Sequence, residues 1–193
     1  MTEMPPEQNR NGQKLDKHTR IPSFKEVKHR VNAALYRLRR RDAFLIQANT
    51  NERTISHKLA EYLQARFPLL KVDCEYNRHG SEIKKLEVPG VNINWDDTEA
   101  RTVFPDIIVH QRNDDRSNLL VVEVKKSSNT QSRDFDKNKL AAFTLPPYKY
   151  RFGLLLEISM RESHDTLKWY AHGHPINERV PTLDNGKEPR ENG

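Results

Sequence analysis

The sequence has little of what stabilises a secreted protein or crosses a membrane. Its 193 residues contain one cysteine, Cys74, so no disulfide can form within the chain. Residues 1–20 contain no apolar run that resembles a signal peptide. The purely apolar runs fall far short of the ~20 residues that span a bilayer. We therefore expect a cytoplasmic protein that has no membrane partner.

Apolar residues are also scarce, and they are unevenly distributed. The hydrophobic set makes up 35% of the chain and charged residues 31%, whereas typical values are roughly 45 to 50% and 25%. Residues 1–20 and 173–193 contain very few Leu, Ile, Val or Phe residues. We expect these two segments to be disordered tails. Residues 21–172 then form a single domain.

Positive charge is concentrated in one segment. Residues 20–42 alone carry a net charge equal to the +6 of the whole chain. Such a patch suits phosphate backbones or an anionic membrane face. A solvated helix that has no charged partner explains the same pattern.

The first half of the chain predicts two helices and a strand. Ser23 and Glu26 have the spacing of a capping box, and apolar residues then recur at helical spacing, so a basic helix is expected at about residues 23–40. Asn49 and Glu52 repeat the cap pattern before a second apolar stripe that ends ahead of Pro68. Alternation over residues 71–77 predicts a half-buried strand. Residues 78–101 are expected to form a loop or a weak hairpin.

The second half predicts mainly strands. Residues 103–111 and 119–126 are rich in β-branched residues and flank a polar turn, which indicates an antiparallel hairpin. A short helix is expected over residues 134–145, where two prolines end it. Two further strands are expected at residues 151–159 and 166–172.

Two carboxylates and a lysine converge in the predicted hairpin. Residues two apart share a face of a strand, so Glu123 and Lys125 are neighbours. If the hairpin is symmetric about residues 114–115, Asp106 lies opposite Glu123, with Cβ atoms ~4.5 to 5.5 Å apart. The alternative is an ordinary lysine and carboxylate pair on a solvated sheet face.

Opposed carboxylates destabilise a sheet unless a cation lies between them. A hard divalent cation such as Mg²⁺ prefers oxygen ligands and also binds phosphate. The adjacent Lys125 suits the same chemistry, since an ammonium can assist an attacking water or stabilise charge that develops on phosphate.

These residues resemble a known family. Pro105-Asp106, a spacer, and Glu123-Val124-Lys125 within an apolar strand are similar to the signature of the PD-(D/E)XK nuclease superfamily, which has the restriction-endonuclease-like fold. The resemblance covers about residues 49–172 and leaves the basic helix outside. It implies that Asp106, Glu123 and the carbonyl of Val124 bind a metal ion and that Lys125 is the catalytic lysine.

The resemblance also points to two helical residues. Members of the superfamily often add a glutamate from the helix before the sheet, and Glu52 matches it. The resemblance implies that Glu52 is a catalytic residue that helps to hold the metal ion, directly or through a water. The alternative role for Glu52 is to cap its own helix by bonding back to Asn49. Lys139, on the helix after the motif, is a candidate contact for substrate. The alternative is a solvated lysine.

We therefore expect an α/β fold (α+β in stricter language), in which helices flank a central mixed sheet and an extra basic helix precedes it. The expected function is Mg²⁺- or Mn²⁺-dependent hydrolysis of nucleic acid, DNA more than RNA. Phosphate contacts carry no base information directly, so the basic helix would bind substrate of any sequence through Arg37, Arg39, Arg40 and Arg41. Two alternatives remain: a non-catalytic binding module that retains the fold, and a subunit of a homodimer or larger complex.

Overall fold

The computed structural model describes residues 20–76, 104–112, 114–160 and 164–177, together with the backbone of two short strands, β2 (Arg78–His79) and β3 (Glu82–Ile83). The helices are α1 (Phe24–Arg41), α2 (Ala43–Gln47), α3 (Glu52–Arg66) and α4 (Asp134–Phe143). The other strands are β1 (Lys71–Cys74), β4 (Ile107–His110), β5 (Leu120–Lys126), β6 (Phe152–Ile158), β7 (Thr166–Ala171) and β8 (His174–Pro175). None of the helices in this part of the chain has the length and apolar character that crossing a bilayer requires.

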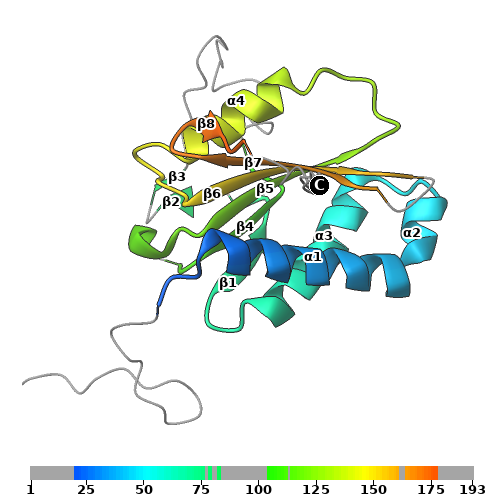
Figure 1. Ribbon diagram of the computed structural model, residues 1–193, viewed down its shortest axis with the longest axis horizontal. Helices are drawn as coiled ribbons and strands as arrows, with labels where there is room; N and C mark the ends of the chain where they lie inside the picture. The colour runs from blue at the N-terminus through cyan, green and yellow to red at the C-terminus, as the bar shows by residue number, and fades with distance from the viewer. Residues whose placement is uncertain are drawn as a thin grey trace, which may run out of the picture.

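Six strands form one mixed sheet in the order β1-β4-β5-β6-β7-β8. Only β5 and β6 are parallel, because α4 connects them across one face of the sheet. Figure 1 shows α1 and α3 on one face and α4 on the other. The expected α/β class, a mixed sheet flanked by helices, is confirmed at this level.

Strand β5 is buried on both faces, because a helical layer covers each side. Leu120, Val122 and Val124 belong to the apolar cluster shared with α1 and α3. Val121 belongs to the smaller cluster beneath α4. Since side chains alternate along a strand, Glu123 shares the α4 side with Val121.

Helix α1 forms as its sequence predicts. Ser23 caps it, and the hydroxyl of Ser23 and the carboxylate of Glu26 complete the capping box. Its buried residues are Val27, Val31, Ala34, Leu35 and Leu38. They form a single stripe at helical spacing, which packs α1 against the sheet and α3.

The predicted hairpin register is confirmed. Ile107 pairs with Val122 and Val109 pairs with Leu120 in antiparallel β4 and β5. Continuing this register by one residue brings Asp106, just before β4, opposite Glu123. The two strands are joined through a 3-10 turn (Asp115–Ser117).

Several boundaries differ from the prediction. Strand β1 ends at Cys74, where residue 77 was expected. The short helix α2 was not predicted. Strand β8 pairs with β7 inside the segment predicted to be a disordered tail, so order continues past residue 173. Most of the two predicted tails and of the predicted loop at 78–101 lies outside the described residues.

Candidate active site

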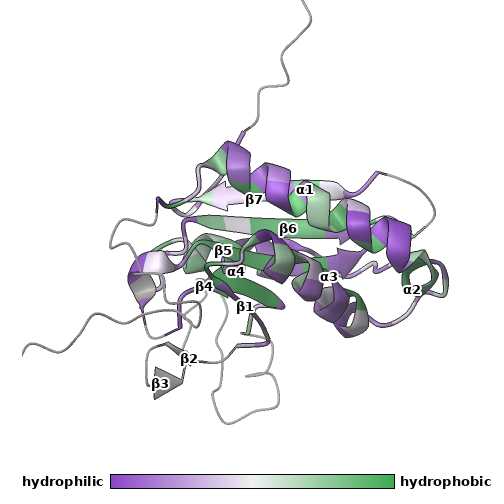
Figure 2. Cartoon of the chain, turned by 90° about the horizontal axis from the view of Figure 1, so that it is seen from below, coloured by the Kyte–Doolittle hydropathy of each residue, from purple (hydrophilic) through white to green (hydrophobic). Residues whose placement is uncertain are grey.

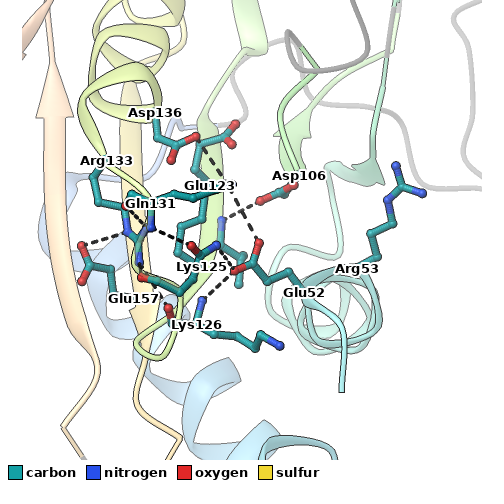
Figure 3. Close-up of polar contacts among 12 residues, drawn as sticks. Glu52, Arg53, Asp106, Glu123, Lys125, Lys126, Gln131, Arg133, Asp136 and Glu157 are labelled. Carbon is teal, nitrogen blue, oxygen red and sulfur yellow. Dashed lines mark hydrogen bonds and ion pairs between the residues drawn. The ribbon is translucent and has the colours of Figure 1, made fainter. Parts of the chain in front are cut away.

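Charged side chains from four elements meet near the end of β5 (Figure 3). Asp106 precedes β4, while Glu123 and Lys125 lie on β5. Asp136 comes from α4, and Glu52 is the first residue of α3. The sheet and the helices on both of its faces therefore all contribute to one cluster.

Asp106 is tied to the neighbouring strand. Its Oδ2 accepts a hydrogen bond of 2.7 Å from the backbone N–H of Val124. Burial raises the pKa of Asp106, although this hydrogen bond and the ammonium groups of Lys139 and Lys125 lower it. Asp106 therefore gives up its proton less readily than an exposed aspartate does.

Glu123 is the most buried carboxylate of the cluster, with 1% of its surface exposed. Its Oε2 lies 2.8 Å from Nζ of Lys139. Its Oε1 has no hydrogen-bond partner within the part of the chain that the structure describes. Burial raises the pKa of Glu123 to about 8, even though Lys139 acts in the opposite direction. A buried carboxylate in this state favours a proton or a further cation.

Lys139 faces Glu123 from α4. It is 3% exposed, so the solvated alternative is wrong. Its Nζ also donates a hydrogen bond of 3.3 Å to the carbonyl of Phe104. The ammonium is thus directed at the buried cluster, where it neutralises part of the negative charge.

Lys125 lies on the same side of β5 as Glu123 and contacts two other carboxylates. Its Nζ is 3.6 Å from Oδ1 of Asp136 and 3.9 Å from Oε2 of Glu52. Burial lowers the pKa of Lys125, but the surrounding carboxylates outweigh this effect and raise it. Lys125 therefore keeps its ammonium at neutral pH and acts as a hydrogen-bond donor.

Glu52 does not cap its helix as the alternative proposed. Asn51 caps α3 instead, by accepting a hydrogen bond from Thr54 N–H. Oε1 of Glu52 accepts bonds of 3.0 Å from the N–H of Lys126 and 3.1 Å from Nδ2 of Asn129. Glu52 therefore points to the end of β5 and joins α3 to it, as its position on the apolar stripe of the helix predicts.

Asp136 was not predicted as a site residue. It is buried, and it faces the cluster one helical turn before Lys139. The signal was present in the sequence, because Asp136, Lys139, Leu140 and Phe143 recur at helical spacing on one face. A charged residue on the buried face of a helix is a candidate for a functional site.

The predicted nucleic-acid contacts on α1 divide into two groups. Arg37, Arg40 and Arg41 are exposed. Arg39 instead forms an ion pair with Asp165 and donates a hydrogen bond of 3.1 Å to the carbonyl of Ser159. Arg39 thus anchors α1 to the end of β6 and the segment that follows.

The site fits a hard cation in part. The described residues contain no group of three or more His, Cys, Asp or Glu side chains arranged around one ion position. Asp106 and Glu123 nevertheless supply two carboxylates, and Oε1 of Glu123 is a buried oxygen that has no partner among the described residues. Carboxylate and carbonyl oxygens are the ligands that Mg²⁺ prefers. Two carboxylates of the kind that Mg²⁺ or Mn²⁺ prefers are therefore present, without a third acidic, histidine or cysteine ligand beside them among the described residues.

No protein-family model, curated protein or solved structure matches this chain.

Proposed function

We propose that this protein is a metal-dependent nuclease of the PD-(D/E)XK superfamily, with the restriction-endonuclease-like fold, and that DNA is its preferred substrate. The order of elements supports the proposal. A helix that carries Glu52 precedes the hairpin of Asp106 and Glu123, and a helix and a parallel strand follow it. This order supports the proposal because the superfamily resemblance rests on a motif in a hairpin, with a helix before it and a helix and strands after it.

One observation carries the proposal. Asp106 and Glu123 lie opposite each other with Lys125 beside them, and Glu123 has an unpaired oxygen within the described structure. A buried polar oxygen without a partner is costly, and natural structures retain few of them. A cation bound between the two carboxylates would remove this cost.

Asp106, Glu123 and the carbonyl of Val124 would hold Mg²⁺ or Mn²⁺. When bound, the ion would polarise the phosphodiester and neutralise the charge that develops on it. Lys125 would donate hydrogen bonds from its ammonium to the attacking water or to the phosphate oxygens. Asp136 and Glu52 flank this ammonium and would fix its position.

A non-catalytic nucleic-acid-binding module is the second candidate, and the contact of Lys139 with Glu123 favours it. This ion pair already supplies a cation to one oxygen of Glu123 without any metal. A fold can retain such a network after its activity is lost. The arginines of α1 would then bind nucleic acid that the protein does not cleave.

The test is cleavage of a panel of single-stranded, duplex and branched DNA and RNA in Mg²⁺, in Mn²⁺ and in EDTA. The nuclease proposal requires products in at least one metal and none in EDTA. If the protein binds the panel but cleaves nothing in either metal, the binding module is correct. Mn²⁺ soaked into crystals provides a check that needs no substrate, because its anomalous signal should appear between Asp106 and Glu123.

A further inference from the structure

Exposed aromatic and basic side chains follow one another along the second half of α1 and into α2. Tyr36 is 68% exposed and Phe44 is 74% exposed. Three exposed arginines lie between them in the sequence: Arg37, Arg40 and Arg41. We call these five residues the aromatic–arginine surface. Figure 2 shows the hydrophilic bands of α1 running up to the hydrophobic turn of α2.

This surface is not explained by packing. The buried stripe of α1 occupies the opposite side of the helix, at Val31, Ala34 and Leu38. The guanidinium groups of Arg37, Arg40 and Arg41 form no ion pair with any residue that the structure describes. Basic residues in the last turn of a helix favour its dipole, which accounts for the arginines. It does not account for two large aromatic rings in water.

We propose that the aromatic–arginine surface binds unpaired nucleotides, so that the protein prefers single-stranded nucleic acid or the single-stranded part of a junction. The inference rests on the proposed function, since it names the form of the substrate. Proteins bind single strands by stacking the bases on aromatic side chains and by pairing the phosphates with positively charged side chains. In duplex DNA the faces of the bases are covered by their neighbours, so a duplex would use the arginines but not the rings.

The chain connects this surface directly to the candidate active site. Thr50 donates hydrogen bonds from its N–H and its hydroxyl to the carbonyl of Leu45, the residue after Phe44. The carbonyl of Thr50 accepts a bond of 3.1 Å from Nζ of Lys126, next to the motif lysine. Glu52 follows two residues later. These bonds tie the end of α2 to the end of β5, beside the motif lysine.

The experiment measures binding of labelled single-stranded DNA and of a duplex of the same sequence, both in EDTA. We expect the wild-type protein to bind the single strand more tightly. Replacing both Tyr36 and Phe44 by Ala should weaken single-strand binding by at least about tenfold and leave duplex binding nearly unchanged. Phe44→Trp should retain affinity, and its fluorescence should be quenched by the bound strand. Leu69→Ala is the control, because Leu69 is another apolar side chain that is 67% exposed, in the turn between α3 and β1.

Three outcomes would overturn the inference. They are equal binding of single strand and duplex, equal loss of both in the double variant, and a dimer in solution that the double variant dissociates without effect on nucleic acid. Circular dichroism must show that each variant is folded. The binding assay contains no metal, so it is independent of the cleavage assay. If the protein cleaves nucleic acid in Mg²⁺ but shows no preference for the single strand in EDTA, only this inference is wrong. If the two aromatic residues are required for single-strand binding but the protein cleaves nothing, only the nuclease proposal is wrong.

Discussion

Lys139 and Glu123 form a buried ion pair, with Nζ 2.8 Å from Oε2, between α4 and the strand that carries the motif. The sequence treats these residues as separate candidates, one for substrate and one for metal. Their contact means that the ammonium of Lys139 is the cation closest to the motif carboxylates among the described side chains. Any divalent ion that binds Glu123 must share it with Lys139 or use the other oxygen.

Lys139→Met removes this ammonium but keeps most of the side-chain volume. We expect the metal-free variant to melt at a lower temperature, by an amount equivalent to about 1 to 3 kcal/mol, because Glu123 loses its buried partner. If the site binds metal, Mn²⁺ should raise the melting temperature of the variant more than that of the wild type. Lys137→Met is the control, since Lys137 pairs with Asp134 on the outside of the same helix. If Mn²⁺ raises the melting temperature of the variant and of the wild type equally, the ion and the ammonium of Lys139 do not compete.

The stability of the metal-free protein should fall as pH rises. Burial raises the pKa of Glu123 from 4.5 to about 8 on folding, so the folded state holds a proton that the unfolded state releases. This contribution is complete below pH 4.5 and is lost between there and about pH 8. The measurement is the melting temperature in EDTA over this range, compared with Glu123→Gln, which should show a flatter profile. If the melting temperatures of the wild type and of Glu123→Gln depend on pH in the same way, Glu123 is not the group that causes the loss of stability.

Metal binding should show the opposite pH dependence. A divalent ion competes with the proton on Glu123, so Mn²⁺ affinity should rise by about tenfold per pH unit below pH 8 for each proton released. Titration calorimetry in buffers that have different ionisation enthalpies would count the protons directly. If the affinity for Mn²⁺ does not depend on pH, the ion does not bind at Glu123.

The parts of the fold predicted correctly are those that leave a local mark. Helix α1 has a complete capping box and an apolar stripe, and the hairpin register follows from the symmetry of its turn. The predicted N-cap of α3 was wrong because two asparagines, Asn49 and Asn51, are both suitable N-cap residues. Asn49 has a positive φ of 52° and closes α2, so the cap falls to Asn51. Helix α2 has five residues, too few to show a period.

The candidate site divides in the same way. Strand periodicity brought Asp106, Glu123 and Lys125 together, because their positions depend on β4 and β5 alone. The role of Lys139 depends on how α4 packs across the sheet, which no local pattern records. Arg39 looked like its exposed neighbours, but it lies at the edge of the buried stripe and reaches Asp165 on a segment 126 residues away.

Arg39 should therefore be required for stability rather than for nucleic-acid binding. Arg39→Ala leaves the carboxylate of Asp165 without its guanidinium, and we expect a loss of about 2 kcal/mol in the free energy of unfolding. Arg40→Ala should change stability little and should weaken nucleic-acid binding equally across sequences. Chemical denaturation and the salt dependence of binding measure the two effects. If Arg39→Ala weakens binding and leaves stability intact, the ion pair with Asp165 is not formed.

Two substitutions separate metal binding from catalysis. Asp106→Asn keeps the shape of the side chain and an acceptor for the N–H of Val124 but removes one charge from the proposed ion site. Metal affinity should fall, while the metal-free fold should be as stable as before or more stable by up to ~1 kcal/mol, because the amide removes the cost of burying the charge, which is what raises the pKa of Asp106.

Lys125→Ala should instead spare metal binding and abolish cleavage, because it removes a hydrogen-bond donor to the reacting groups and not an ion ligand. Lys168→Ala, on β7, is the control and should cleave like the wild type, since its ammonium lies near Glu157 and not near the motif. The readouts are Mn²⁺ titration, product formation in Mg²⁺, and melting temperature with and without metal. If Asp106→Asn and Lys125→Ala both lose stability and cleave normally, the cluster of Asp106, Glu123 and Lys125 is a structural ion network and the active site lies elsewhere.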